Sequence, residues 1–281
     1  MARIVAGIGS SHAPSIAFAY DAGHQQRPQW KSFFDAYVPV KHWLQRLRPD
    51  TLIVFYNDHL NRFQLDAYPT FAIGVAPELP IADEGRGRRP LPDVEGDAAL
   101  AWHVARSLVA DEFDLCVSRE MVLDHGVMSI LPLIADQPWP MRVVPIAVNV
   151  IAEPLPTPRR CWRIGEAVAR AVRSHAADTR VAVMATGGLS HQLHGAGFGF
   201  TNPEWDNRFM DLLEHEPERL AAASHDDFVL RGGAESVEMM VWLAMRGALA
   251  ESGGALRRVQ RHYTAPMLTG YGLLAYERVD P

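Results

Sequence analysis

Short runs rich in valine and isoleucine recur along the chain, and they constrain its fold more than any other feature. Their apolar residues are nearly continuous and do not alternate with polar ones, which is typical of strands covered by helices on both faces. We predict six such strands, at Arg3–Ile8, Leu52–Tyr56, Thr70–Val75, Arg142–Val148, Val181–Met184 and Tyr271–Glu277.

Segments with helical periodicity separate these strands. The predicted helices are Gln29–Leu47, Gly96–Ala110, Arg159–Ala176, Pro203–Glu214 and Gly233–Ala248. This alternation predicts the α/β class, with a three-layer α/β/α sandwich around a mixed sheet. The Pro- and Gly-rich stretches at 77–92 and 153–158 are expected to be loops within one domain that spans residues 1–281.

Charge and cysteine content exclude several classes of protein. The formal net charge is −6 and no basic stripe is present, so we expect no nucleic-acid partner. Cys116 and Cys161 do not form a CxxC pair, which argues against a thiolate metal cage or a disulfide framework. Because no run approaches the roughly 20 apolar residues of a membrane span, we expect no membrane partner and a soluble, cytoplasmic protein.

Three histidines follow predicted strands. His12 lies in SSHAP after the first strand, His59 ends VFYNDH after the second, and His191 ends GGLSH after the fifth. Ligands of open α/β sheets bind beyond the carboxyl ends of the strands, so we expect a metal or acid–base site at one rim. Asn57 and Asp58 either orient the ring of His59 or form a turn.

The stretch around His191 suggests a close approach of backbone to a ligand. Gly187 and Gly188 permit a sharp turn there, and His191 is preferred over His194 because it lies nearer the strand end. A fourth histidine, His125 in LDHG, lies at another loop-to-helix junction and its role is less defined.

A carboxylate would complete a divalent-metal site, and the last predicted helix offers two. Glu235 suits the positive end of the helix, whereas Glu238 lies deeper among apolar residues, where a carboxylate is costly unless paired or bound to metal. Two histidines and one carboxylate are typical of non-haem Fe(II) oxygen chemistry. Zinc would accept the same ligands, and spacing alone does not separate the two metals.

A series of motifs resembles the class III extradiol ring-cleaving dioxygenases, especially their protocatechuate 4,5-cleaving members. The motifs occur in order, from Met1 to about residue 250: SSHAP, VFYNDH, PTFAIG, ADEGRGRRPLPDVEG, DEFD, LDHG, VVPIAVNV, GGLSHQLHG and GAESVEMMVWLAMRGAL. The resemblance implies one Fe(II) ion held by His12, His59 and Glu238. It also implies that His191 is the acid–base residue and that His125 touches substrate or oxygen.

The implied reaction is extradiol cleavage of a catecholic aromatic acid by O2, with protocatechuate expected first and gallate, methylgallate or another catechol as alternatives. The chain departs from the family pattern in the stretch 262–272, where a serine that lines the substrate pocket in the family is missing. The identity of the substituent on the substrate ring is therefore left open. The arginines Arg86, Arg88 and Arg89 form either a solvated loop or a cationic wall beside a substrate carboxylate.

The resemblance also implies partners. We expect a small α subunit that covers the active site, and an oligomeric protein. Two other functions stay open on the residues alone: a zinc-dependent hydrolase on a similar scaffold, and a metal-free binding protein with the same fold.

Overall fold

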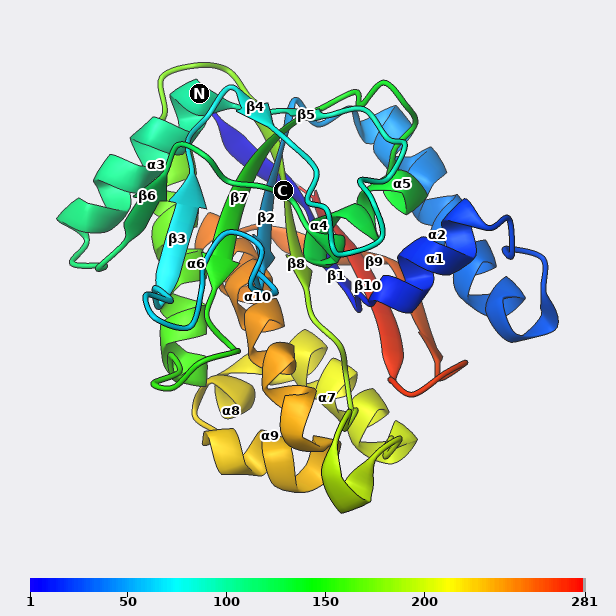
Figure 1. Cartoon of the computed structure of the whole chain (residues 1–281). Coiled ribbons are helices and arrows are strands. Elements are labelled where there is room, and N and C mark those ends of the chain that lie inside the picture. Colours follow the sequence, from blue (N-terminus) through cyan, green and yellow to red (C-terminus); the bar gives the residue numbers. More distant parts are fainter. Residues whose placement is uncertain (280–281) are drawn as a thin grey trace.

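Eight strands form one mixed sheet in the computed structural model, which describes residues 1–279 (Figure 1). The strands are β1 (Arg3–Ser10), β2 (Thr51–Tyr56), β3 (Phe71–Gly74), β6 (Cys116–Ser118), β7 (Arg142–Val148), β8 (Arg180–Thr186), β9 (Ala255–Thr264) and β10 (Tyr271–Val279). Their order is β6-β3-β7-β2-β8-β1-β10-β9. The four central strands β7, β2, β8 and β1 are parallel, whereas β3 and β10 pair antiparallel with β7 and β1.

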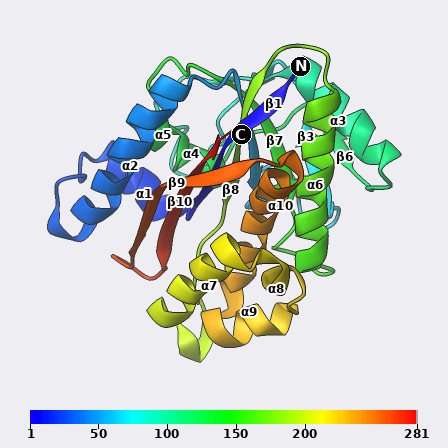
Figure 2. The same ribbon diagram turned by 180° about the vertical axis from the view of Figure 1, so that it is seen from behind.

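Helices cover both faces of this sheet. One face carries α1 (Pro14–Asp21), α2 (Pro28–Leu47), α4 (His125–Met128) and α5 (Leu131–Ile134), and the other carries α3 (Ala98–Ala110), α6 (Pro158–Ser174) and α10 (Trp242–Ser252) (Figure 2). Residues of β2 alternate between the two cores: Ile53 packs on the α6 side, while Leu52 and Val54 pack on the α2 side. The predicted α/β/α sandwich around a mixed sheet is therefore confirmed.

Further helices gather beyond the carboxyl ends of the central strands, as Figure 1 shows. They are α7 (Pro203–His215), α8 (Pro217–Ala221), α9 (His225–Gly232) and the 3-10 helix η2 (Ala234–Val241), which leads into α10. A short 3-10 turn, η1 (Gly195–Gly197), and a two-stranded ladder of β4 (Glu78–Leu79) and β5 (Val94–Glu95) lie in loops. No helix within residues 1–279 is long and apolar enough to span a membrane.

Several elements of the structure were not predicted, including the strands β4, β5 and β6 and the helices α1, α4, α5, α8 and α9. The strand β9 was not predicted, because this edge strand carries Arg257, Arg258 and Arg261 and lacks an apolar run. The helix predicted at 233–248 begins instead as the 3-10 helix η2. Gly233 enters that segment with φ of 92°, and a Cβ there would lie 2.4 Å from the carbonyl oxygen of His191, so the chain is held tightly at this point.

Candidate active site

The order of the central strands brings three of the predicted site histidines together. β8 lies between β2 and β1, so the segments that leave these three parallel strands emerge side by side at one end of the sheet. They carry His59, His191 and His12 respectively. The amide of Gly187 donates to the carbonyl of Ser10 at 3.1 Å, which joins the exits of β8 and β1.

His12, His59 and Glu238 converge at this end of the sheet. His12 Nε2 lies 3.4 Å from one oxygen of Glu238, and His59 Nε2 lies 4.0 Å from the other. The rings of His12 and His59 are 5.0 Å apart between centroids. His125 joins them, since one ring nitrogen from each of the three histidines lies within 4.8 Å of the others.

His12 provides the test of whether a cation fits this cluster. Its side chain is almost fully buried, and neither ring nitrogen has a hydrogen-bond partner among residues 1–279. Burial, together with the neighbouring His59 and His125, lowers the pKa of His12 well below 6.5, so the ring is neutral. Buried polar atoms without partners are rare and costly. A neutral imidazole beside a carboxylate is a good donor set for Fe(II) or Zn(II), and these residues therefore fit a metal ion.

His59 is oriented by the carboxylate of Asp124. One oxygen of Asp124 accepts from the backbone N–H of His59 at 2.7 Å and from its Nδ1 at 2.9 Å, which leaves Nε2 facing the cluster. Burial alone would lower the pKa of His59, but the Asp124 carboxylate outweighs it and raises that pKa to about 9. Asp124 also caps α4 through the amide of Gly126. Asp124 was not predicted as a site residue, although its position before a short helix was a capping signal.

The two residues that precede His59 behave differently. The Asn57 amide nitrogen lies 2.8 Å from His59 Nε2, to which it donates when the ring is neutral, and it donates to Glu238 at 3.4 Å, so Asn57 does contact the cluster. Asp58 instead accepts from the backbone amides of Arg62 and Phe63. Of the two alternatives for these residues, the turn therefore applies to Asp58, which stabilises it.

Glu238 reaches the cluster because Gly187 and Gly188 let the η2 segment approach the exit of β8. The amide of Gly188 donates to a Glu238 carboxylate oxygen at 2.6 Å. A Cβ on Gly187 would lie 2.5 Å from the carbonyl oxygen of Glu238, and a Cβ on Gly188 would lie 3.2 Å from its carboxylate. The two glycines thus permit the close approach that their sequence suggested.

Glu235 lies on the same face of η2 but outside the cluster. Its carboxylate accepts from the backbone amide of Leu193 and lies 2.6 Å from Nδ1 of the exposed His194. The structure therefore separates the two glutamates, with Glu238 inside and Glu235 outside, and it separates His191 from His194 in the same way.

His191 is buried, and its ring is fixed by the backbone. Nδ1 donates to the carbonyl of Leu189 at 2.7 Å, and the backbone amide donates to the carbonyl of Gly232 at 2.8 Å. The bond from Nδ1 to the Leu189 carbonyl places the proton of a neutral ring on Nδ1 and leaves Nε2 as an acceptor. The arrangement suits a group that takes up a proton from a bound molecule.

A buried carboxylate holds the segment next to His191. Asp206 accepts from the backbone amide of Ser190 at 2.8 Å, from the Ser190 hydroxyl at 2.6 Å and from the Tyr263 hydroxyl at 2.8 Å. Burial raises the pKa of Asp206, although the bonds from Ser190 and Tyr263 oppose the shift. No sequence signal near Asp206, in the first turn of α7, indicated this role.

Other predicted residues lie at the rim. Thr269, from the stretch that departs from the family pattern, is buried and forms a β-bridge with His191. Arg88 pairs with Asp93 at 2.5 Å, and Arg89 pairs with Asp21 at 2.7 Å. These pairs favour a structural role for both arginines over a cationic wall for the substrate.

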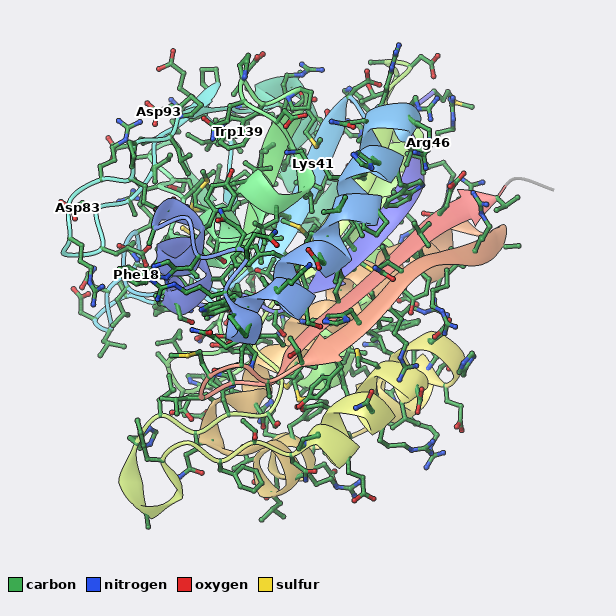
Figure 3. All side chains as sticks on the ribbon, turned by 90° about the vertical axis from the view of Figure 1, so that its right-hand side faces the viewer. Phe18, Lys41, Arg46, Asp83, Asp93 and Trp139 are labelled. Carbon is green, nitrogen blue, oxygen red and sulfur yellow. The ribbon has the colours of Figure 1, made fainter. Side chains whose placement is uncertain are left out.

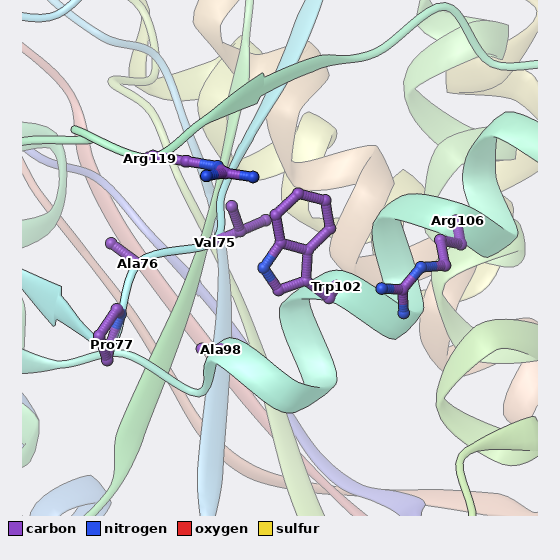
Figure 4. Close-up of a pocket in the computed structure, with 7 residues that line it drawn as sticks. All are labelled: Val75, Ala76, Pro77, Ala98, Trp102, Arg106 and Arg119. Atoms are coloured by element: carbon purple, nitrogen blue, oxygen red, sulfur yellow. The ribbon is translucent and has the colours of Figure 1, made fainter.

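A separate cavity of about 530 Å³ lies at the opposite end of the sheet (Figure 4). Val75, which lines it, follows β3, and β3 runs antiparallel to β7. The guanidinium groups of Arg106 and Arg119 each lie 5.5 Å from the Trp102 ring. Among the described residues, those that line this cavity include no histidine or carboxylate, so we place the candidate active site at the histidine cluster instead.

Comparisons with known proteins bear on this site. The family described as the catalytic LigB subunit of aromatic ring-opening dioxygenase matches residues 6–274. A gallate dioxygenase of Pseudomonas putida is 44% identical over 204 residues, which are 71% of this chain and 58% of that protein. The chain thus matches less than two thirds of that relative's length. A 2,3-dihydroxyphenylpropionate/2,3-dihydroxicinnamic acid 1,2-dioxygenase of Rhodococcus is 30% identical, over 87% of this chain and 90% of that protein.

One solved structure shares the fold. An uncharacterized protein of Escherichia coli K12 superposes with a TM-score of 0.56 over 98% of this chain and 100% of that chain. The two sequences are 12% identical, so this similarity concerns the architecture alone.

Proposed function

The chain belongs to the family of catalytic LigB subunits of aromatic ring-opening dioxygenases, and from this premise we propose that it catalyses Fe(II)-dependent extradiol cleavage of a catecholic aromatic acid by O2. The observation that carries the proposal is the largely buried cluster of His12, His59 and Glu238, in which both ring nitrogens of His12 lack a hydrogen-bond partner among residues 1–279. Two histidines and a carboxylate leave coordination positions open for reactants, as in non-haem Fe(II) oxygenases.

We propose protocatechuate or gallate as the substrate. The gallate dioxygenase and the dihydroxyphenylpropionate dioxygenase, by their names, act on aromatic acids with adjacent hydroxyl groups. The higher identity to the gallate enzyme favours a carboxylate attached directly to the ring. Thr269, which is buried and forms a β-bridge with His191, is proposed to contact a ring substituent.

The chain's own residues divide the chemistry among them. When bound, Fe(II) would supply a centre at which the two catechol oxygens and O2 are held next to each other. His12, His59 and Glu238 would hold that ion. His191 takes the proton of a catechol hydroxyl on Nε2, because its Nδ1 proton is bound to the Leu189 carbonyl.

His125 lies against this site, with its ring centroid 3.8 Å from that of His59. A ring in that place can contact the substrate or oxygen and exchange a proton with either. The buried setting of His12 and His191 excludes bulk water from the reacting groups, which strengthens the polar interactions among them.

We further propose that a small α subunit covers the site. An apolar patch surrounds the rim next to His191, and it consists of the exposed side chains Leu193, Phe198, Phe200, Met267 and Leu268. The two loops that carry it touch each other, since a Cβ on Gly199 would lie 3.4 Å from Leu268. Contiguous exposed apolar patches mark interaction sites. Sedimentation of the protein alone and with a candidate subunit would test both this partner and the proposed oligomer.

Oxygen uptake is the test of the reaction. The protein is loaded anaerobically with Fe(II), with Zn(II) or with no metal, and each form is mixed with protocatechuate, gallate, 2,3-dihydroxyphenylpropionate and catechol. We expect uptake and a yellow ring-opened product with Fe(II) only, and fastest with one of the two benzoates. Activity with Zn(II) that ignores oxygen would favour a hydrolase, and binding of aromatic acids without turnover in any form would favour a binding protein.

A further inference from the structure

Glu84 contacts His125 through two bonds from one carboxylate. One oxygen lies 2.5 Å from His125 Nδ1, and the other accepts from the backbone amide of His125 at 3.0 Å. The His125 side chain is 8% exposed and that of Glu84 is 30% exposed. Both donors point at the same carboxylate, so the ring and the backbone of His125 are held as one unit.

The loop around Glu84 is shaped so that its side chain reaches His125. Ile81 forms a parallel β-bridge with Leu123, close to His125 in the chain, and the amide of Ala82 donates to the Leu123 carbonyl at 3.0 Å. Beyond Glu84, the carboxylate of Asp83 accepts from the amides of Gly85 and Gly87.

Those two glycines adopt φ of 85° and 82°, a region that other residues rarely enter. The sequence Asp-Glu-Gly-Arg-Gly therefore encodes a tight turn with Glu84 at its inner side. The positive φ angles of this turn explain why glycine occupies positions 85 and 87.

A second anchor fixes the far part of the same loop. Arg89 donates from two nitrogens to the Asp21 carboxylate, each at 2.7 Å, and from Nη1 to the carbonyl of Met128 at 2.5 Å. Asp21 ends α1 and Met128 ends α4. Figure 3 shows the loop, marked by Asp83 and Asp93, beside the helix that carries Phe18.

We propose that Glu84 is a positioning residue for His125, and that the loop 80–93 holds the Glu84 carboxylate against that ring. This inference rests on the proposed function and deepens it. The Glu84 carboxylate accepts the Nδ1 proton of His125, so a neutral ring presents the lone pair of Nε2 to the site. Partners of this kind fix both the tautomer and the orientation of a histidine.

A purely structural role for this contact gives a different expectation. Glu84 is partly exposed, and an ion pair in such a place adds little to stability. If Glu84 only tied down the loop, its loss would leave the tautomer of the His125 ring and the turnover unchanged. As a positioning residue, its loss changes the ring and the turnover, with little effect on melting.

The decisive variant is Glu84→Gln. A carboxylate accepts from both donors of His125, whereas an amide offers only one acceptor oxygen and turns an N–H group toward the second donor. Glu84→Ala removes both acceptors and serves as the second variant. Glu78→Gln, an exposed glutamate on β4 in the preceding segment, is the matched control.

The first readout does not depend on activity. Long-range proton–nitrogen NMR of metal-free protein labelled with 15N-histidine reports the tautomer of each ring, and the His125 signal is assigned by its loss in His125→Gln. We expect His125 to carry its proton on Nδ1 in the wild type and in Glu78→Gln. In Glu84→Gln and Glu84→Ala we expect a shift toward the Nε2-protonated form. An unchanged His125 signal in both Glu84 variants would overturn the inference.

The second readout is kinetic. With the best catechol and Fe(II), Glu84→Gln is expected to lower kcat by about 10–100-fold, as for other partners that orient histidines, with a smaller change in KM. In the His125→Gln background the same substitution is expected to have no further effect, because Glu84 acts only through that ring. Full additivity of the two substitutions would refute the positioning role.

The two proposals fail separately. Absence of ring cleavage by the wild-type protein with every catechol would remove the proposed reaction, yet the NMR signal would still decide whether Glu84 sets the ring of His125.

Discussion

Asp206 provides a quantitative test of how the site is supported. This carboxylate is fully buried and accepts three hydrogen bonds, two from Ser190 and one from Tyr263. Ser190 directly precedes His191, and its hydroxyl accepts from the amide of Asn202 at 2.6 Å. Substitution Asp206→Ala removes the common acceptor of these three donors.

The cost follows from the burial of each donor. A buried donor that loses its acceptor costs about 1–3 kcal/mol, and both donors of Ser190 are buried. The Tyr263 hydroxyl belongs to a half-exposed residue and can find water. We therefore expect Asp206→Ala to lower the free energy of unfolding by about 2–4 kcal/mol. For a chain of this size that corresponds to a fall of roughly 4–16 °C in Tm.

Urea denaturation followed by circular dichroism measures this change, with thermal melting as a second assay. Asp206→Asn keeps one carbonyl acceptor and is expected to cost about 1 kcal/mol, and Tyr263→Phe about 1 kcal/mol or less. Asp206→Ala should also lower turnover, since the segment that carries His191 loses its anchor. A loss below about 0.5 kcal/mol for Asp206→Ala, the range of ordinary surface substitutions, would refute the reasoning.

Three further predictions concern the same region. Asp124→Asn should weaken Fe(II) or Zn(II) binding by about 10–100-fold, because an amide cannot hold the His59 ring as the carboxylate does. Equilibrium dialysis with metal analysis would measure this change, and an unchanged metal affinity would contradict the prediction. Gly188→Ala places a Cβ 2.6 Å from the His191 ring, so ring-cleaving activity should fall, with a stability cost of about 1–3 kcal/mol; wild-type turnover would exclude this steric account. Burial raises the pKa of Asp206 above its usual 3.8, so the folded state binds the proton more tightly than the unfolded state and its contribution is lost as pH rises. The stability of the wild type relative to Asp206→Asn should therefore decrease as the pH rises above about 4 in urea titrations, and a constant difference would argue against the shift.

The sequence predicts the three histidines of the site because the carboxyl ends of strands can be recognised in the sequence. Apolar runs that stop at a polar residue placed His12, His59 and His191 at one rim, and the adjacency of β1, β8 and β2 explains why they meet. The apolar neighbours of Glu238 favoured it over Glu235, but only the family resemblance singled it out, and the structure separates the two in that direction.

The supporting carboxylates were not predictable from the sequence alone. Glu84 and His125 are 41 positions apart, and Asp206 and Ser190 are 16 apart in different elements. Such contacts depend on how loops pack on the sheet, and a local pattern does not record this. The same limit explains β9, whose edge position makes charged residues compatible with a strand.

The pairing of β1 has a consequence for the order in which this protein can be assembled during synthesis. β1 is made first, yet its two neighbours in the sheet are β8 and β10, which include residues 180–186 and 271–279. The link that follows β1 is also held by β10, since the amide of Ser11 donates to the Gly272 carbonyl and the amide of Gly272 donates to the Ser11 hydroxyl. Contacts between such distant parts of a chain form slowly. During synthesis, the segment that carries His12 therefore lacks its contacts with β10 until the last part of the sheet is made, and a nascent chain that stops short of β10 has an incomplete candidate site.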